Sequence, residues 1–187
     1  YIGFTQGSHL QAEFDITEAV VEGINTIQIK VLKWCWGSYL EDQDMWRISG
    51  VYRDVNLVFI PYQHIDDIYA YSVMSDDFKQ ADVVCKVAFS CKGGEVDDAD
   101  LALSLIAPDG KEVMKDSLKV LELDDGDELE YEFKGTVLNP LLWSAETPNL
   151  YRLRVTLKET PNYKNPITFD VREINFGFRK IEVVGKR

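Results

Sequence analysis

The sequence predicts an all-β protein, in which an immunoglobulin-like β-sandwich follows part of a second β domain. Strand signals dominate the chain, and turn residues separate the strand-like runs after Pro61. About seven such runs fit into roughly 120 residues, which is typical of an immunoglobulin-like sandwich. These observations place the complete sandwich in the later part of the chain.

The first part of the chain, Tyr1–Ile60, is predicted to be the second half of another β domain. Asp15 can cap a short helical turn that Gly23 ends. Asn25–Leu32 alternates apolar and polar residues, the pattern of a half-buried strand, and Val51–Ile60 is apolar on both faces, as in a strand between two layers. Three or four strands in about 60 residues make a poor core, so we expect the first half of this domain to be absent.

The strand-like runs after Pro61 make up the predicted sandwich. They are His64–Ser72, Ala81–Cys91, Leu101–Ile106, Leu118–Leu123, Leu129–Val137, Tyr151–Leu157 and Ile167–Val171. Gly93-Gly94 and Pro108-Asp109-Gly110 provide turn chemistry between them. Because the cysteine-tryptophan-cysteine pattern of antibody domains is missing, we expect apolar packing alone to hold the two sheets together.

Composition narrows the class of protein. The chain is 45% hydrophobic and 28% charged, as in ordinary globular proteins, and no apolar run approaches the roughly 20 residues that span a bilayer. Its net charge of −12 disfavours nucleic acid as a partner. The acids gather in Asp97–Asp100 and Asp124–Glu132, where we expect solvated loops and strand ends. Asp124–Asp127 has only a fragment of the spacing of a calcium-binding loop.

The cysteines and histidines do not predict a disulfide or a zinc site. Cys85 and Cys91 lie in one predicted strand, which separates them by roughly 20 Å, beyond disulfide reach. We expect both to be small buried apolar residues. Cys35 makes the count odd, and His9 and His64 are far apart in sequence.

The stretch Trp34–Gly50 is the most unusual in the chain. It concentrates three of the four tryptophans beside three carboxylates and Arg47. Aromatic faces and carboxylates together suit a carbohydrate contact loop, because rings stack on sugar C–H surfaces while carboxylates accept hydrogen bonds from hydroxyls. The same composition suits a buried structural corner, with the tryptophans as core and Arg47 paired to an acid, and composition alone favours this second interpretation.

Four stretches of the chain resemble one family in the right order. Tyr39–Val55 resembles the end of the sugar-binding domain of the large bacterial β-galactosidases of glycoside hydrolase family two. Gln6–Asp15 and Asn139–Tyr151 resemble other parts of these enzymes, and Gly177–Arg179 resembles the end of their immunoglobulin-like domain. The resemblance covers essentially the whole chain.

The resemblance implies a domain organisation. Residues 1–61 would be the C-terminal part of the sugar-binding jelly-roll (galactose-binding-like) domain, residues 62–180 the immunoglobulin-like domain, and residues 181–187 the start of a linker to a TIM barrel. Family members hydrolyse terminal β-galactosides with retention of the anomeric configuration, and they use two glutamates of the TIM barrel for this reaction. These would lie beyond Arg187, so we expect a non-catalytic fragment with no glycosidase activity of its own. The compartment stays open between bacterial cytoplasm and periplasm.

One site residue is implied by the resemblance. Asp44 corresponds to the family aspartate that hydrogen-bonds galactose and helps to bind sodium, and an ionised carboxylate suits both tasks. Its neighbours are expected to position it: Glu41, Asp42, Met45, Trp46 and Arg47. The alternative for Asp44 is a salt bridge within this corner.

A magnesium site is the weaker cofactor prediction. Gln6 aligns with a residue near a peripheral magnesium site in some relatives, but Trp36 stands where those relatives have an acidic ligand. No cofactor is expected in this chain itself, and sodium or magnesium would belong to the parent enzyme. The expected partners are the β-galactoside substrate and the TIM barrel of the same chain, with no nucleic acid and no membrane.

Other residues are predicted to be structural. We expect Trp143 to be an edge residue packed against Pro140 and Pro148 rather than a sugar platform, and Arg53 and Asp54 to form an ion pair within a strand.

Two rival functions remain at this point. The chain could be a free-standing carbohydrate-binding module or a structural immunoglobulin-like domain. The half-domain predicted for Tyr1–Ile60 argues against both, because an independent module should contain a closed core.

Overall fold

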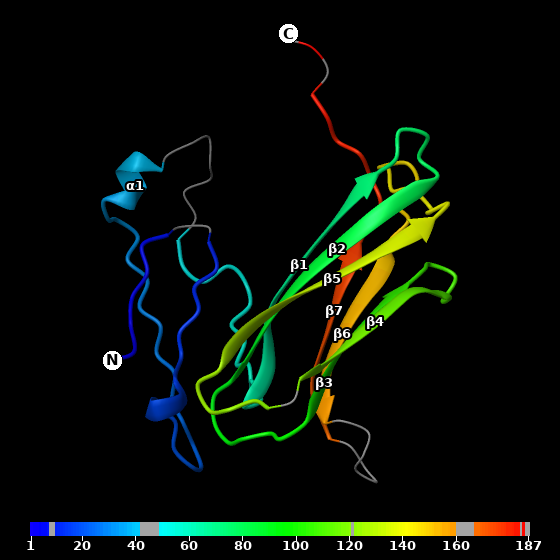
Figure 1. Cartoon of the computed structure of the whole chain (residues 1–187). Helices are drawn as coiled ribbons and strands as arrows, with labels where there is room; N and C mark the ends of the chain where they lie inside the picture. Colours follow the sequence, from blue (N-terminus) through cyan, green and yellow to red (C-terminus); the bar gives the residue numbers. More distant parts are fainter. Residues whose placement is uncertain (8–9, 42–48, 121, 160–166, 184, 186–187) are drawn as a thin grey trace. The chain divides into compact units, whose positions relative to one another are not determined.

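The computed structural model describes residues 1–7, 10–41, 49–120, 122–159, 167–183 and 185 (Figure 1). The chain divides into two compact units, Tyr1–Val58 and Phe59–Arg187. The second unit contains two antiparallel sheets, which confirms the predicted all-β class.

Seven strands form the second unit. They are β1 (Gln63–Met74), β2 (Gln80–Cys91), β3 (Ala99–Ile106), β4 (Glu112–Val120), β5 (Glu128–Leu138), β6 (Tyr151–Glu159) and β7 (Thr168–Phe176). One sheet has the order β1-β2-β5 and the other the order β4-β3-β6-β7, and every pair is antiparallel (Figure 1). Each strand overlaps one of the seven runs predicted from sequence.

The core lies between the inner faces of the two sheets. Alternate residues of β3 are buried, and Leu103 lies opposite Val155 of β6 in the register of the four-stranded sheet. On the other sheet, alternate residues of β2 from Val83 to Cys91 are buried. Cys85 and Cys91 are both free and buried, so apolar packing rather than a disulfide joins the sheets, as expected.

The position predicted for the fourth strand was wrong. We expected Leu118–Leu123, but β4 begins six residues earlier, at Glu112. This strand lies at the edge of its sheet, and only Met114 and Val120 of it are buried, so its apolar pattern is weak. The turn before β4 matches its prediction: Ala107 N–H donates to the Lys111 carbonyl at 2.8 Å, and Gly110 takes a φ of +87°.

The first unit has little regular structure among its described residues. It contains a short 3₁₀ helix, η1 (Thr17–Ala19), and one helical turn, α1 (Gly37–Leu40). Asp15 accepts a hydrogen bond from Thr17 N–H at 2.9 Å, as the predicted cap requires, and Gly23 takes a φ of +102°.

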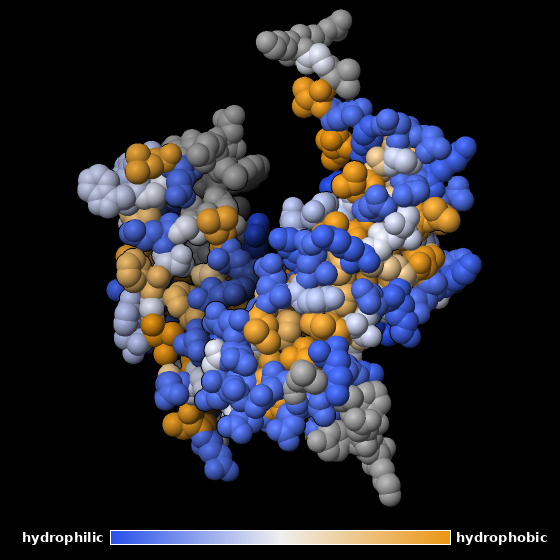
Figure 2. Space-filling view, viewed as in Figure 1, coloured by the Kyte–Doolittle hydropathy of each residue, from blue (hydrophilic) through white to orange (hydrophobic). Residues whose placement is uncertain are grey.

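Two predicted strands, Asn25–Leu32 and Val51–Ile60, do not form in the structure. Their apolar residues are exposed, and Figure 2 shows apolar side chains at the surface of the unit Tyr1–Val58. Alternation marks a face that can be buried, but a strand also needs a paired neighbour and a layer to pack on. No described residue of this unit is buried, so neither requirement is met.

No helix in the described part of the chain is long and apolar enough to cross a membrane.

Candidate functional site

The aromatic loop Trp34–Gly50 holds the residue that the family resemblance singled out. Its described parts are residues 34–41 and 49–50. Asp44 lies outside the described residues, as do Asp42, Met45, Trp46 and Arg47. The role of Asp44 in contacting substrate and sodium therefore stays a prediction.

Hydrogen bonds to Ser38 hold the first turn of this loop. The Ser38 hydroxyl donates to the Lys33 carbonyl at 3.0 Å and accepts from Cys35 N–H at 3.1 Å. Glu41 N–H donates to the Gly37 carbonyl at 2.9 Å and closes α1. One serine thus connects the residues on both sides of Trp34.

The aromatic side chains of this loop lie at the surface of the first unit. Trp34 is 56% exposed, Trp36 82% and Tyr39 74%. Trp34 and Tyr39 contact each other with ring centroids 6.4 Å apart, and the Lys33 ammonium lies 5.6 Å from the Trp34 centroid. These exposures contradict a core role for Trp34 and Trp36 within this unit, and they leave ring surface that can stack on a sugar.

Cys35 is an exposed thiol in the same turn. The hydrogen bonds from Ser38 lower the pKa of the Cys35 thiol below its ordinary value. By contrast, burial raises the pKa of Cys85 to about 12. Because the thiolate is the reactive form, Cys35 is the favoured target of alkylation among these two thiols.

We expect Ser38→Ala to slow the alkylation of Cys35 by iodoacetamide at pH 7.5. The substitution removes the side-chain hydrogen bond from Ser38, the largest cause of the lowered pKa, and keeps the backbone ones, so the pH profile of the alkylation rate should move to higher pH. Peptide mass spectrometry at several pH values measures this rate. Ser38→Thr keeps the hydroxyl and serves as the control, and identical profiles for wild type and Ser38→Ala would contradict the assignment.

Metal ligands do not gather in the described part of the chain. No group of three or more His, Cys, Asp or Glu residues that could hold a metal ion occurs among the described residues. Asp44 lies outside that part, so the sodium and magnesium predictions remain untested.

A buried polar cluster lies at the start of β1. His64 Nε2 lies 3.0 Å from the Asp66 carboxylate and 3.3 Å from the Ser90 hydroxyl, and His64 Nδ1 lies 3.3 Å from the Tyr62 carbonyl. In a Ser-His-Asp triad the serine and the aspartate contact opposite nitrogens of the imidazole. Here both face Nε2, and Ser90 is 1% exposed, so the cluster ties the ends of β1 and β2 together and does not form a nucleophilic site.

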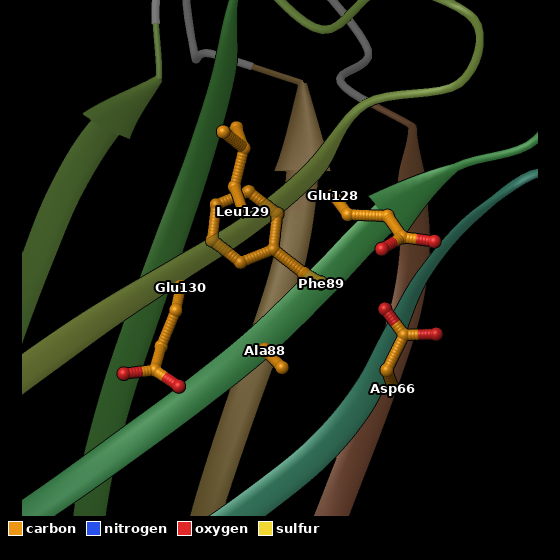
Figure 3. Close-up of a pocket in the computed structure, with 6 residues that line it drawn as sticks. All are labelled: Asp66, Ala88, Phe89, Glu128, Leu129 and Glu130. Atoms are coloured by element: carbon orange, nitrogen blue, oxygen red, sulfur yellow. The ribbon is translucent and has the colours of Figure 1, made fainter.

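The Asp66 carboxylate also lines an open cavity of about 330 Å³. Figure 3 shows Asp66 and Glu128 on one side of this cavity and Glu130 on the other. Phe89 and Leu129 lie between them. No local pattern in the sequence marks these residues as a group, because they come from β1, β2 and β5 and only the pairing of these strands brings them together.

Trp143 lies at the edge of the sandwich, where it was expected. It forms an antiparallel β-bridge with Pro148, and its backbone N–H donates to the Phe178 carbonyl at 2.8 Å. The Arg179 guanidinium lies 5.1 Å from the centroid of its ring.

The ion pair predicted between Arg53 and Asp54 does not occur among the described ion pairs. Arg53 lies instead over the Tyr52 ring, 5.6 Å from its centroid.

Two family models match the chain and together cover most of it. The model described as "Glycosyl hydrolases family 2, sugar binding domain" matches residues 1–61. The model described as "Glycosyl hydrolases family 2" matches residues 63–179.

Curated relatives are similar along the whole chain. A β-galactosidase of Erwinia tasmaniensis is 35% identical over 193 residues, which cover 99% of this chain and 18% of the relative. A β-galactosidase of Leuconostoc mesenteroides is 33% identical over 187 residues, which cover 98% of this chain and 17% of the relative. The chain thus spans less than a fifth of the length of these relatives.

Solved structures share the fold over part of the chain. A β-glucuronidase of Parabacteroides merdae has a TM-score of 0.53 and 28% identity, covering 67% of this chain and 15% of that one. A Bacteroides fragilis protein described as a putative β-galactosidase has a TM-score of 0.53 and 22% identity, covering 63% and 16%, and this likeness concerns the fold alone.

Proposed function

Because this chain belongs to glycosyl hydrolase family 2, we propose that it is a non-catalytic part of a retaining β-galactosidase. The observation that carries this proposal is the similarity to β-galactosidases over 98–99% of the chain. In this proposal the sugar-binding unit contributes Asp44 to the active site, and the sandwich is a spacer before the catalytic barrel.

The proposed role of Asp44 follows from the chemistry of a carboxylate. An ionised carboxylate accepts hydrogen bonds from two sugar hydroxyls and is a hard oxygen ligand for sodium. The exposed rings of Trp34 and Tyr39, ten and five residues before Asp44 in the sequence, support a carbohydrate contact in this loop. A magnesium site has less support, because Trp36 stands where some relatives have an acidic magnesium ligand.

The sandwich supports the spacer role through its rigidity. Its buried residues form one apolar cluster between the two sheets, including Phe89, Leu103 and Phe133. A close-packed core deforms little, so such a sandwich can hold the domains on either side of it at a fixed separation. The proposed catalytic glutamates belong to the part of the relatives that this chain does not match.

The test compares a full-length enzyme carrying this chain with the 187-residue chain alone. We expect the full-length enzyme to hydrolyse nitrophenyl β-galactoside much faster than nitrophenyl β-glucuronide, and the chain alone to hydrolyse neither. The glucuronide is included because of the similarity to the Parabacteroides merdae β-glucuronidase. A preference for the glucuronide would overturn the galactosidase assignment, and turnover by the chain alone would overturn its non-catalytic role.

A further inference from the structure

An open cavity of about 490 Å³ lies in the second unit, between β1 and the segment that follows β7. Its volume is within the usual range of small-molecule sites. The lining residues used below are Tyr71, Ser72, Trp143, Asn175 and Arg179. They come from three separate stretches of the chain and lie in the unit that does not contain the Asp44 loop.

One wall of this cavity is held in place by backbone and packing contacts. The backbone N–H of Trp143 donates to the Phe178 carbonyl at 2.8 Å, and Leu142 forms a parallel β-bridge with Phe178. A Cβ added at Gly177 would lie only 3.0 Å from the Cβ of Trp143, so the backbone there approaches the indole closely. The position of the Trp143 ring is therefore fixed before any ligand binds, which lowers the entropic cost of binding.

The same wall presents a guanidinium. Arg179 stacks over the Trp143 ring at 5.1 Å from its centroid. Among the described ion pairs, none gives Arg179 a carboxylate partner, whereas the adjacent Lys180 pairs with Asp76 at 3.0 Å and with Glu182 at 3.2 Å. When a guanidinium stacks on an aromatic ring, its N–H donors lie in the plane of the guanidinium and stay free to bind oxygen acceptors.

The facing wall supplies an aromatic surface and further polar groups. Tyr71 is 40% exposed and lies on edge strand β1. Ser72, on the same strand, provides a hydroxyl, and Asn175 of β7 adds an amide from the stretch that leads to Arg179. An exposed ring with nearby hydroxyl, amide and guanidinium groups is the combination that recognises a sugar, whose C–H face is apolar and whose rim carries hydroxyls.

We propose that this cavity is an accessory saccharide site, at which Tyr71 stacks on a sugar ring and Arg179 donates hydrogen bonds to sugar oxygens. Asn175 and Ser72 complete the polar rim. The lining residues all belong to the second unit and do not include Asp44, so failure of this site would leave the proposed function of the aromatic loop unchanged.

The test is a titration of the 187-residue chain with β-1,4-galactobiose, followed by isothermal calorimetry. We expect a dissociation constant of roughly millimolar size, as one stacked ring and a few hydrogen bonds allow. Tyr71→Ala and Arg179→Ala should each weaken binding by about tenfold. Tyr69→Ala is the matched control, because Tyr69 contacts Tyr71 on the same strand, with centroids 5.7 Å apart, but does not line the cavity.

Two further measurements keep the proposal falsifiable. Arg179→Lys keeps the charge but loses the planar fork, so it should weaken binding while leaving the melting temperature unchanged. Asp44→Asn should leave this binding intact. Binding that is absent at 50 mM saccharide (roughly fiftyfold above the expected constant), or that survives Tyr71→Ala, or that is lost with Asp44→Asn, would overturn the accessory site.

Discussion

Replacing Asp44 by asparagine in the full-length enzyme is expected to lower kcat/KM for a β-galactoside by about 10- to 100-fold. Hydrogen bonds to a charged group are worth about 1.5–3 kcal/mol, and each 1.4 kcal/mol corresponds to a factor of ten. Asparagine keeps the size of the side chain but loses the charge and one acceptor. Steady-state hydrolysis of nitrophenyl β-galactoside measures the effect.

The control for Asp44→Asn is Asp42→Asn, two residues away in the same acidic run. We expect Asp42→Asn to change kcat/KM much less, because Asp42 is proposed to position the loop. If Asp44 also helps to bind sodium, replacing sodium by a larger cation should impair the wild type more than the Asp44→Asn variant. Unchanged activity of Asp44→Asn would return this residue to a salt bridge within the corner.

Replacing Phe178 by alanine should destabilise the sandwich by about 3–5 kcal/mol, the usual cost of removing a fully buried phenylalanine. Phe178 is 0% exposed and packs edge-to-face against Tyr151 and Phe176, with centroids 4.8 Å and 5.1 Å away. Its carbonyl also accepts the hydrogen bond from Trp143 N–H. Urea denaturation followed by circular dichroism measures the change in the free energy of unfolding.

Phe59→Ala is the matched control for this prediction. Phe59 is the same residue type in the same unit, but it is 87% exposed, so its replacement should change the free energy of unfolding by less than about 0.5 kcal/mol. Equal effects of the two substitutions would show that the packing of Phe178 does not hold this end of the sandwich. A loss at Phe178 alone would support the fixed wall on which the accessory site depends.

The seven sandwich strands could be predicted from sequence because their patterns are local and strong. In β2, the alternation from Val83 to Cys91 shows directly which face is buried. The edge strand β4 was misplaced because only one of its faces packs and few of its residues are buried.

The first unit shows where pattern reasoning is insufficient. Asn25–Leu32 has the alternation of a strand, yet it forms none, because pairing depends on a neighbour that no local pattern supplies. The aromatic loop was found from composition and from the family resemblance. Its ring exposures were not predicted, because exposure depends on what the rest of the fold covers.

The all-β class, the number of sandwich strands, the family and the choice of Asp44 as a candidate residue could all be inferred from the sequence alone. These depend on short-range periodicity and on uninterrupted motifs, which are visible along the chain. The folded structure was needed to see that Tyr71, Trp143 and Arg179 line one cavity. It was also needed to see that His64, Asp66 and Ser90 form one cluster. The reason is that strand pairing joins residues far apart in sequence, and side-chain alternation alone does not specify which strands become neighbours.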